Sequence, residues 1–244
     1  MSDTTLTPSA RPSADSLPTG ATTAAPSTGM GELAKPSLST SSLFVVIPLR
    51  KGSQGCPGKS LRPFNSSTLL EHAVHDAIQI GPTHIIVTTD YGLDEVPVSV
   101  RPYHVSRPAH LCHPDTPMTL VLKHVAQSMF PMDTILLMQP NCYHPDRLRL
   151  ARRVLNERVA GTSVRYPDFW HPAYAIGSRS RRPKTRQSLE PAYRPDGLLY
   201  RVPVAHLLLL DPFDGDYVPV HGTVNVDTEA DWEELNERYG VRNL

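Results

Sequence analysis

The sequence predicts an α/β protein whose mostly parallel sheet carries helices on both faces. Three largely apolar runs, residues 43–49, 84–90 and 133–138, have the composition of strands buried on both sides. Segments with apolar residues at helical spacing separate these runs. The 244 residues are enough for one such domain with a sizeable core. Strands that alternate with helices pair in parallel, because each helix returns the chain to the edge of the sheet where the previous strand began.

The first strand follows a segment of different composition. Residues 1–42 are mainly Ser, Thr, Pro, Ala and Gly, and they include few large apolar side chains. Such a segment buries too little surface to offset the entropy lost on ordering. We therefore expect residues 1–42 to be a disordered extension and residues 43–244 to form one α/β domain. The alternative is a tail that folds on contact with a partner.

Helices are expected between and after the strands. Residues 68–78 have helical periodicity and follow Ser66 and Ser67, which we interpret as N-terminal caps. The same periodicity predicts helices over residues 117–129 and 146–157.

The second half of the chain is less regular. Residues 162–166, 173–176 and 198–202 predict short strands. A last helix is expected over residues 228–239, with Thr228 as its N-cap and acidic side chains in its first turn.

The charge and composition narrow the classes of partner. The chain has 24 basic and 24 acidic side chains and zero formal net charge, so nucleic acid and anionic membranes are not expected partners. No apolar run approaches the roughly 20 residues of a membrane span. Three cysteines provide neither a disulfide framework nor the paired spacing of a zinc site. There is no basic flank before an apolar N-terminal segment, so the expected location is cytoplasmic.

A glycine-rich loop follows the first strand. It reads Leu-Arg-Lys-Gly-Ser-Gln-Gly-Cys-Pro-Gly-Lys over residues 49–59, with Arg50 and Lys59 near its ends. Ligands collect at the carboxyl ends of parallel strands, and backbone N–H groups of such loops can surround phosphates. The spacing matches neither a Walker loop nor the dinucleotide motif. The loop is expected to bind a triphosphate; the alternative is a surface turn rich in glycine.

A family resemblance appears in this segment. Residues 47–61 resemble the Arg-x-Gly-Ser-Lys-x-x-Pro-x-Lys-Asn segment that the acylneuraminate cytidylyltransferases, or CMP-sialic acid synthetases, use to bind CTP. Five further motifs resemble that family in the same order. They are Val-Thr-Thr-Asp at 87–90, Arg-Pro with Asp-Thr at 107–116, Leu-Met-Gln-Pro at 137–140, the Arg-Gln to Leu-Tyr segment at 186–200, and Asn-Val-Asp-Thr-Glu-Ala-Asp at 225–231.

The resemblance implies a Rossmann-like fold of the nucleotide-diphospho-sugar transferase type. It implies transfer of CMP from CTP to an acidic or unusual sugar, with release of pyrophosphate, in the presence of Mg²⁺ or Mn²⁺. The implied partners are therefore CTP and a small sugar acceptor. Relatives in this family are commonly dimers, so a homodimer is expected.

The resemblance also assigns roles to individual residues. Transfer of CMP is an in-line displacement at phosphorus, which needs neutralisation of phosphate charge more than it needs a strong base. Arg50 and Lys59 are therefore the expected catalytic residues. The nucleotide-binding residues are expected to be Leu49, Arg50, Gly52, Ser53, Gln54, Lys59, Ser60 and Asp90. The sugar-binding residues are expected to be Gln139, Arg186, Gln187 and Tyr193, and the metal ligands Asp227 and Asn225. From the residues themselves, Asp227 could equally be an acid at a helix N-terminus, and Asp90 could cap the segment after its strand.

The chain departs from the family pattern at four positions. Gln54 stands in place of a lysine, Ser60 in place of an asparagine, Asp196 in place of an asparagine and Asn225 in place of an aspartate. Residues 91–97 are too short for the family's helix, and residues 141–145 differ on the acceptor side. Two alternatives therefore stay open. One is a catalytically weak or inactive nucleotide-binding protein of the same fold, and the other is a nucleotidyltransferase with a different nucleotide or acceptor.

Overall fold

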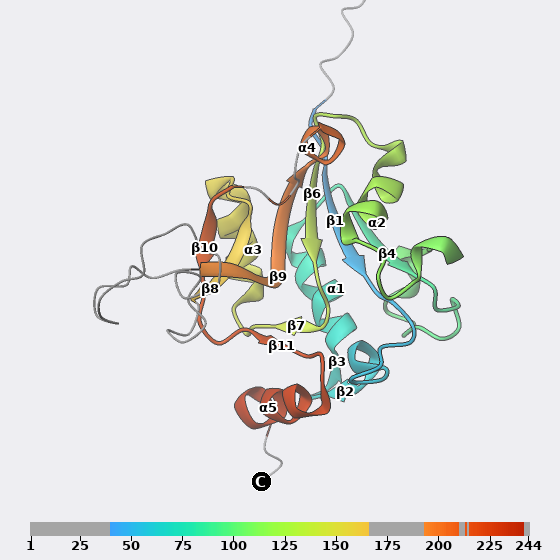
Figure 1. The fold of residues 1–244 in the computed structure, drawn as a ribbon, viewed down its shortest axis with the longest axis vertical. Coiled ribbons are helices and arrows are strands. Elements are labelled where there is room, and N and C mark those ends of the chain that lie inside the picture. The colour runs from blue at the N-terminus through green and yellow to red at the C-terminus, as the bar shows by residue number, and fades with distance from the viewer. Residues whose placement is uncertain (1–39, 166–192, 210–212, 214, 242–244) are drawn as a thin grey trace, which may run out of the picture. The chain divides into compact units, whose positions relative to one another are not determined.

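Three parallel strands form the centre of the structure. The computed structural model describes residues 40–165, 193–209, 213 and 215–241. In it, β1 (Leu43–Pro48) lies between β4 (His84–Thr89) and β6 (Thr134–Met138) and is parallel to both (Figure 1). These are the three strands expected from the apolar runs, and all three end at the same edge of the sheet.

The complete sheet has seven strands in the order β10-β8-β9-β6-β1-β4-β5. The outer strands are β5 (His104–Ser106), β8 (Gly161–Arg165), β9 (Tyr193–Pro203) and β10 (Tyr217–Pro219). β9 runs antiparallel to both of its neighbours, whereas the other pairs are parallel. The mostly parallel sheet that the sequence predicts is confirmed.

Helices cover both faces of this sheet, also as predicted. Side chains of a strand point alternately to opposite faces. Val45 and Ile47 accordingly pack in a core cluster with α1 and α3, and Val46 packs in a second cluster with α2 and α4. These helices are α1 (Leu69–Ile80), α2 (Met118–Val125), α3 (Arg147–Glu157) and α4 (Val204–Leu209).

A smaller layer lies at the end of the sheet where β1 finishes. It contains two short antiparallel pairs, β2 (Pro63–Phe64) with β3 (Ser67–Thr68) and β7 (Cys142–Tyr143) with β11 (Val224–Asn225). Helix α5 (Glu229–Tyr239) lies beyond them (Figure 1). A third core cluster, which includes Phe64, Leu69 and Leu235, joins this layer to α1. The layer brings the last part of the chain close to the glycine-rich loop.

One of the two predicted helix caps is present in the structure. Ser66 and Ser67 were the wrong residues for α1, because Thr68 is its N-cap and forms a reciprocal capping box with Glu71. Thr68 is the residue whose side chain reaches the N–H of Glu71, three positions later. At α5, Thr228 is the N-cap as predicted, and Asp231 completes its capping box.

The predicted boundaries were less accurate for the irregular elements. α2 ends at Val125 and continues as a short 3₁₀ helix, η4 (Ala126–Ser128). The expected strand at 162–166 corresponds to β8 and that at 198–202 lies within the longer β9, whereas residues 173–176 lie outside the described residues. The sequence did not indicate β5, β7, β10 or β11, because two or three residues are too few to show alternation. Within the described part of the chain, no helix is long and apolar enough to span a membrane.

Candidate functional site

A cavity of about 250 Å³ lies at the carboxyl edge of the central strands. We call it the strand-end cavity. Its walls come from the segments that follow β1, β4, β5 and β6, which is the edge where parallel sheets bind ligands. The lining includes Leu49, Arg50, Ser53, Lys59, Ser60, Tyr91, Arg107, Gln139 and Asn141. Five of the eight predicted nucleotide-binding residues are therefore brought together here.

The glycine-rich loop is shaped by two of its glycines. Gly58 has a φ of 65° and directly precedes the 3₁₀ helix η1 (Lys59–Leu61), whose first residue enters the cavity wall. Gly55 packs against the backbone of Asp227, since a Cβ added to Gly55 would lie 2.4 Å from the Asp227 carbonyl oxygen. A side chain at position 55 would force the loop away from Asp227.

Three predicted nucleotide-binding residues do not line this cavity. Gly52 and Gln54 are exposed elsewhere on the loop. Asp90 instead accepts a hydrogen bond of 2.7 Å from the backbone N–H of Lys51 and so fastens the loop to the end of β4. A short acidic side chain after a strand commonly binds a nearby backbone N–H.

Lys51 also turns away from the cavity. Its Nζ forms an ion pair with Glu95 and lies 5.3 Å from the centre of the Tyr91 ring. The hydrogen bond with Glu95 raises the pKa of Lys51 and lowers the pKa of Glu95. Lys51 thus does not replace the positive charge that is missing at Gln54.

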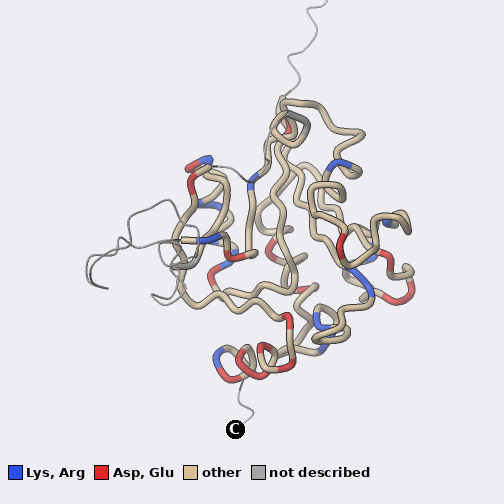
Figure 2. The backbone as a smooth tube through the Cα atoms, viewed as in Figure 1, with Lys and Arg blue, Asp and Glu red and all other residues tan. Residues whose placement is uncertain are grey.

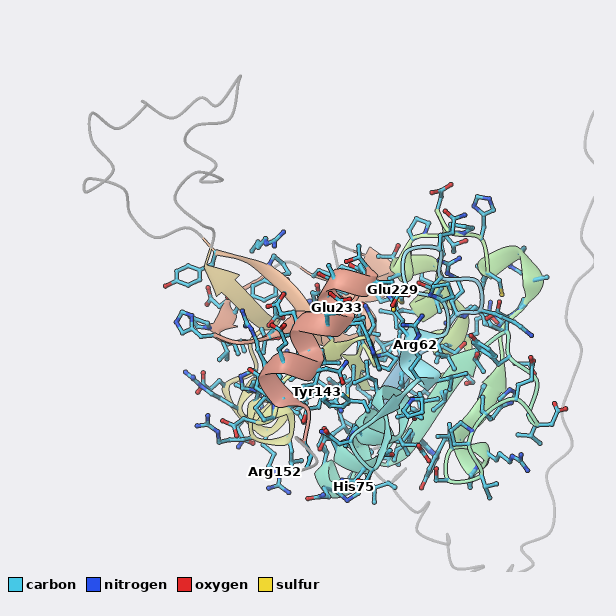
Figure 3. The ribbon with its side chains drawn as sticks, turned by 90° about the horizontal axis from the view of Figure 1, so that it is seen from below. Arg62, His75, Tyr143, Arg152, Glu229 and Glu233 are labelled. Atoms are coloured by element: carbon cyan, nitrogen blue, oxygen red, sulfur yellow. The ribbon has the colours of Figure 1, made fainter. Side chains whose placement is uncertain are left out.

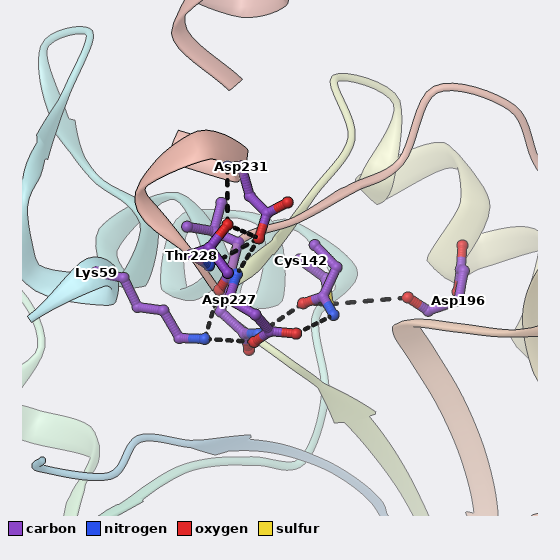
Figure 4. A network of polar contacts seen from close by, with 9 residues as sticks. Lys59, Cys142, Asp196, Asp227, Thr228 and Asp231 are labelled. Carbon is purple, nitrogen blue, oxygen red and sulfur yellow. Dashed lines mark hydrogen bonds and ion pairs between the residues drawn. The ribbon is translucent and has the colours of Figure 1, made fainter. Parts of the chain in front are cut away.

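Lys59 connects the loop to the segment before α5. Its Nζ lies 2.6 Å from Asp227 Oδ1 and also donates to the Val226 carbonyl oxygen (Figure 4). The Lys59 side chain is 16% exposed and that of Asp227 is 60% exposed. The predicted phosphate-binding cation and the predicted metal ligand are therefore direct neighbours.

Arg107 is a cavity residue to which the sequence reasoning gave no role. It is 7% exposed, and its Nη2 donates to the Thr88 carbonyl oxygen at 2.8 Å. Its Nε is buried without a hydrogen-bond partner among the described residues. Burial lowers the pKa of Arg107, because desolvation disfavours the charged form. In the sequence, the Arg-Pro motif at 107–108 was the signal that could have identified this residue. In the structure, a guanidinium buried this deeply beside a cavity indicates a ligand, because buried charges are normally paired.

A second cavity, of about 590 Å³, adjoins the first. Gln139 lines both. We call the second one the acidic cavity, because its described lining includes Asp196, Asp227, Asp231 and Glu234 beside Arg194. Asp196 is buried and accepts hydrogen bonds from the Thr162 and Thr223 hydroxyls at 2.6 and 3.0 Å. Figure 2 shows acidic residues gathered along α5 and the segment before it.

The predicted sugar-binding residues are divided by the structure. Gln139 lies at the junction of the two cavities. Tyr193, at the start of β9, is 46% exposed and lines neither cavity. Arg186 and Gln187 lie outside the described residues.

The predicted metal ligands are adjacent but differ in what they present. Asp227 offers an exposed carboxylate beside Lys59, and Mg²⁺ is commonly held by one or two carboxylates together with substrate phosphates and water. Asn225 directs its Nδ2 at Asp227 Oδ2, 2.8 Å away, so it presents no oxygen on the side of Asp227. No group of three or more His, Cys, Asp or Glu in the described residues is arranged to hold a metal. The donor set thus suits an ion held by Asp227 with the remaining ligands from substrate and water.

Helix α5 is fixed beside the loop by a bidentate ion pair. The two terminal nitrogens of Arg62 lie 2.6 and 2.7 Å from the carboxylate oxygens of Glu229 (Figure 3). The Arg62 guanidinium also lies 5.6 Å from the centre of the Trp232 ring. Arg62 follows η1, so this contact holds the end of the loop and the start of α5 together.

Comparisons with known proteins show a local family match and a shared fold. A family model described as cytidylyltransferase matches residues 44–96, which span β1, the glycine-rich loop, α1 and β4. The chain is similar to a structure of CMP:2-keto-3-deoxy-manno-octonic acid synthetase complexed with CTP, with 18% identity and a TM-score of 0.58 over 81% of this chain and 98% of that one. It is also similar to the UTP-bound UGPase from Acinetobacter baumannii, with 14% identity and a TM-score of 0.50 over 83% and 94% of the two chains. The structural likeness confirms the Rossmann-like fold.

Proposed function

We propose that the chain is a divergent cytidylyltransferase, which transfers CMP from CTP to a sugar hydroxyl and releases pyrophosphate. The main observation in favour is the strand-end cavity. It brings Arg50, Lys59 and Arg107 together at the carboxyl ends of parallel strands, where a triphosphate would find cationic side chains and loop N–H groups.

The proposed reaction is an in-line displacement at phosphorus. The acceptor hydroxyl oxygen forms a bond to the α-phosphorus and loses its proton to water, the bond from that phosphorus to the bridging oxygen breaks, and pyrophosphate leaves with the bonding electrons. Arg50 and Lys59 would offset the negative charge of the triphosphate, and Asp227 would hold Mg²⁺ or Mn²⁺, which supplies further charge neutralisation when bound.

The base is part of the proposal. Ser60, which replaces the family's asparagine, is 6% exposed and lines the strand-end cavity. Its short hydroxyl cannot make the two directed hydrogen bonds that an amide makes to a base edge. We propose CTP as the substrate because the family match spans this loop. UTP is the nucleotide to compare with it, since the UGPase structure holds UTP.

The acceptor has two candidates. The family resemblance favours an acidic sugar. The acidic cavity favours instead a neutral or amino sugar, because a carboxylate placed among Asp196, Asp227 and Asp231 would be repelled. Gln139 can donate to a sugar hydroxyl in either case, since it faces both cavities.

Pyrophosphate release tests the reaction. The protein would be incubated with each nucleoside triphosphate, Mg²⁺ or Mn²⁺, and keto-acid, neutral and amino sugars. We expect release with CTP and an acceptor, and its loss in Lys59→Met. Lys123→Met, the same change at an exposed lysine of α2, is the matched control. Measurable CTP binding without release for any acceptor would support the inactive nucleotide-binding alternative.

The assembly and the location complete the proposal. We propose a homodimer in the cytoplasm, following the family resemblance. Light scattering on the purified protein would test the dimer, because a monomer mass across the working concentration range would contradict it.

A further inference from the structure

The carboxylate of Asp227 is held from two sides by side chains of different charge. Lys59 Nζ is 2.6 Å from Oδ1, and Asn225 Nδ2 is 2.8 Å from Oδ2 (Figure 4). The backbone N–H of Asp227 donates to Asp231 Oδ2 at 2.9 Å. Each carboxylate oxygen therefore has one fixed donor, and the carboxylate plane is set before any ligand arrives.

The orientation of the Asn225 amide follows from its neighbours. Its Oδ1 accepts from Asn141 Nδ2 at 2.7 Å and from Cys142 Sγ at 3.1 Å. Turning the amide over would direct its NH₂ at these two donors and its oxygen at a carboxylate. Only one orientation of the amide satisfies all three contacts. The pairing of Asn225 with Cys142 across β11 and β7 fixes the backbone of both residues.

We propose that Asn225 is a positioning residue that orients Asp227 toward Lys59, rather than a ligand of the metal, and that a divalent ion consequently binds only together with the nucleotide. The inference rests on the proposed function. Asp227 and the triphosphate would both bind Lys59. When a triphosphate binds Lys59, Asp227 Oδ1 is released and becomes available to the ion. One exposed carboxylate binds a free divalent ion weakly, so the phosphates must complete the site.

One substitution gives opposite results for a positioning residue and for a ligand. Asn141→Ala removes one donor from Asn225 Oδ1. If Asn225 positions Asp227, the amide can then rotate, and Mn²⁺ binding in the presence of CTP weakens. If Asn225 Oδ1 is a ligand, the same change frees that oxygen and Mn²⁺ binding tightens. Asn225→Asp places a second carboxylate beside Asp227, so Mn²⁺ alone should bind about tenfold more tightly than in the unaltered protein.

Titration with Mn²⁺, followed by the electron paramagnetic resonance signal of the free ion, measures these affinities without turnover. In the unaltered protein we expect Mn²⁺ to bind at least about tenfold more tightly with CTP than without it. Binding of CTP in EDTA, measured for every variant, separates an effect on the strand-end cavity from an effect on the metal. Asn156→Ala, at an exposed amide on α3, serves as the control and should change neither affinity.

The number of waters on the bound ion gives an independent reading. In Asn225→Ala with CTP, the count of Mn²⁺-bound waters, measured by broadening from ¹⁷O-labelled water, should equal that of the unaltered protein. One additional water, or tighter Mn²⁺ binding in Asn141→Ala, would overturn the positioning role. CTP binding that is independent of Mn²⁺ would overturn the coupling, and an absence of CTP binding would overturn the proposed function as well.

Discussion

At the scale of single residues, Gly55 joins the glycine-rich loop to Asp227. It has no side chain at the point where the loop backbone meets the Asp227 carbonyl group. The contact allows Lys59, four positions later, to reach Asp227 Oδ1 at 2.6 Å. This glycine of the predicted phosphate-binding loop is thus required for close packing.

Gly55→Ala should separate the loop from Asp227. The added Cβ would lie 2.4 Å from backbone oxygen, which cannot rotate away, and such overpacking typically destabilises by about 1–3 kcal/mol. We expect a folded protein whose CTP affinity in the presence of Mn²⁺, measured by calorimetry, falls by about tenfold or more. Gly92→Ala is the control, since its Cβ would meet the Asp94 carboxylate, a side chain that can move. Equal affinities for the two variants would contradict the role of Gly55.

At the scale of elements, the helix caps decide where the site-bearing segments begin. The Thr228–Asp231 capping box starts α5 directly after Asp227, and the Thr68–Glu71 box starts α1 after β3. Burial would raise the pKa of Glu71, but hydrogen bonds from Ser99, Ser67 and Thr68 outweigh it and lower this pKa. The lowered pKa means that the carboxylate form is favoured by folding.

Glu71→Gln should therefore destabilise the protein in a pH-dependent manner. A carboxylate with a lowered folded-state pKa adds stability above its unfolded pKa of about 4.3, and this stability is lost as the pH falls through the folded pKa. We expect the free energy of unfolding in urea to fall by about 1 kcal/mol at pH 7. The difference should shrink below about pH 4. Glu233→Gln, at an exposed position of α5, is the control, and a difference independent of pH would contradict the assignment.

At the scale of the whole molecule, the site is assembled from segments far apart in the chain. Lys59 and Asp227 are separated by 168 positions. The sheet brings the ends of β1, β4 and β6 to one edge, and the β7–β11 pair and α5 close the lower side of that edge (Figure 1). Ser42, directly before β1, is held at the N-terminal side of the sheet. Its N–H donates to Oδ1 of the buried Asp133 at 2.9 Å.

Truncation should locate the start of the folded domain. A chain that begins at Thr40 keeps the Ser42 contacts with Asp133 and Thr134, so we expect its thermal midpoint and its CTP affinity to match those of the full chain. A chain that begins at Phe44 loses them together with the first residue of β1. Its midpoint should fall by several degrees, at about 2–4 °C per kcal/mol for a domain of this size. A lower midpoint for the Thr40 chain in calorimetry would show that residues 1–39 stabilise the domain.

The sequence by itself determined the three central strands of the sheet and the presence of helices on both of its faces. Val45, Val46 and Ile47 are each buried. A continuous apolar run predicts a strand covered on both faces, and this prediction needs only the local sequence and the presence of helices elsewhere in the chain. The Thr228 cap was likewise readable, since the cap and its partner are three residues apart. The Ser66 and Ser67 prediction failed within the same short range, because neighbouring hydroxyls are equivalent until the backbone turns at Thr68.

Only the tertiary structure decided what each polar side chain of the site contacts. Lys51 binds Glu95, the Asn225 amide turns its nitrogen to Asp227, and Arg107 is buried beside the strand-end cavity. A polar side chain takes the partner that satisfies its charge and hydrogen bonds, and the partners here are 44 positions away for Lys51 and 83 or more for the donors to Asn225. Local periodicity carries no information about such pairs. The pattern of apolar residues therefore predicts the fold, whereas the chemistry of the site depends on which distant segments the fold brings together.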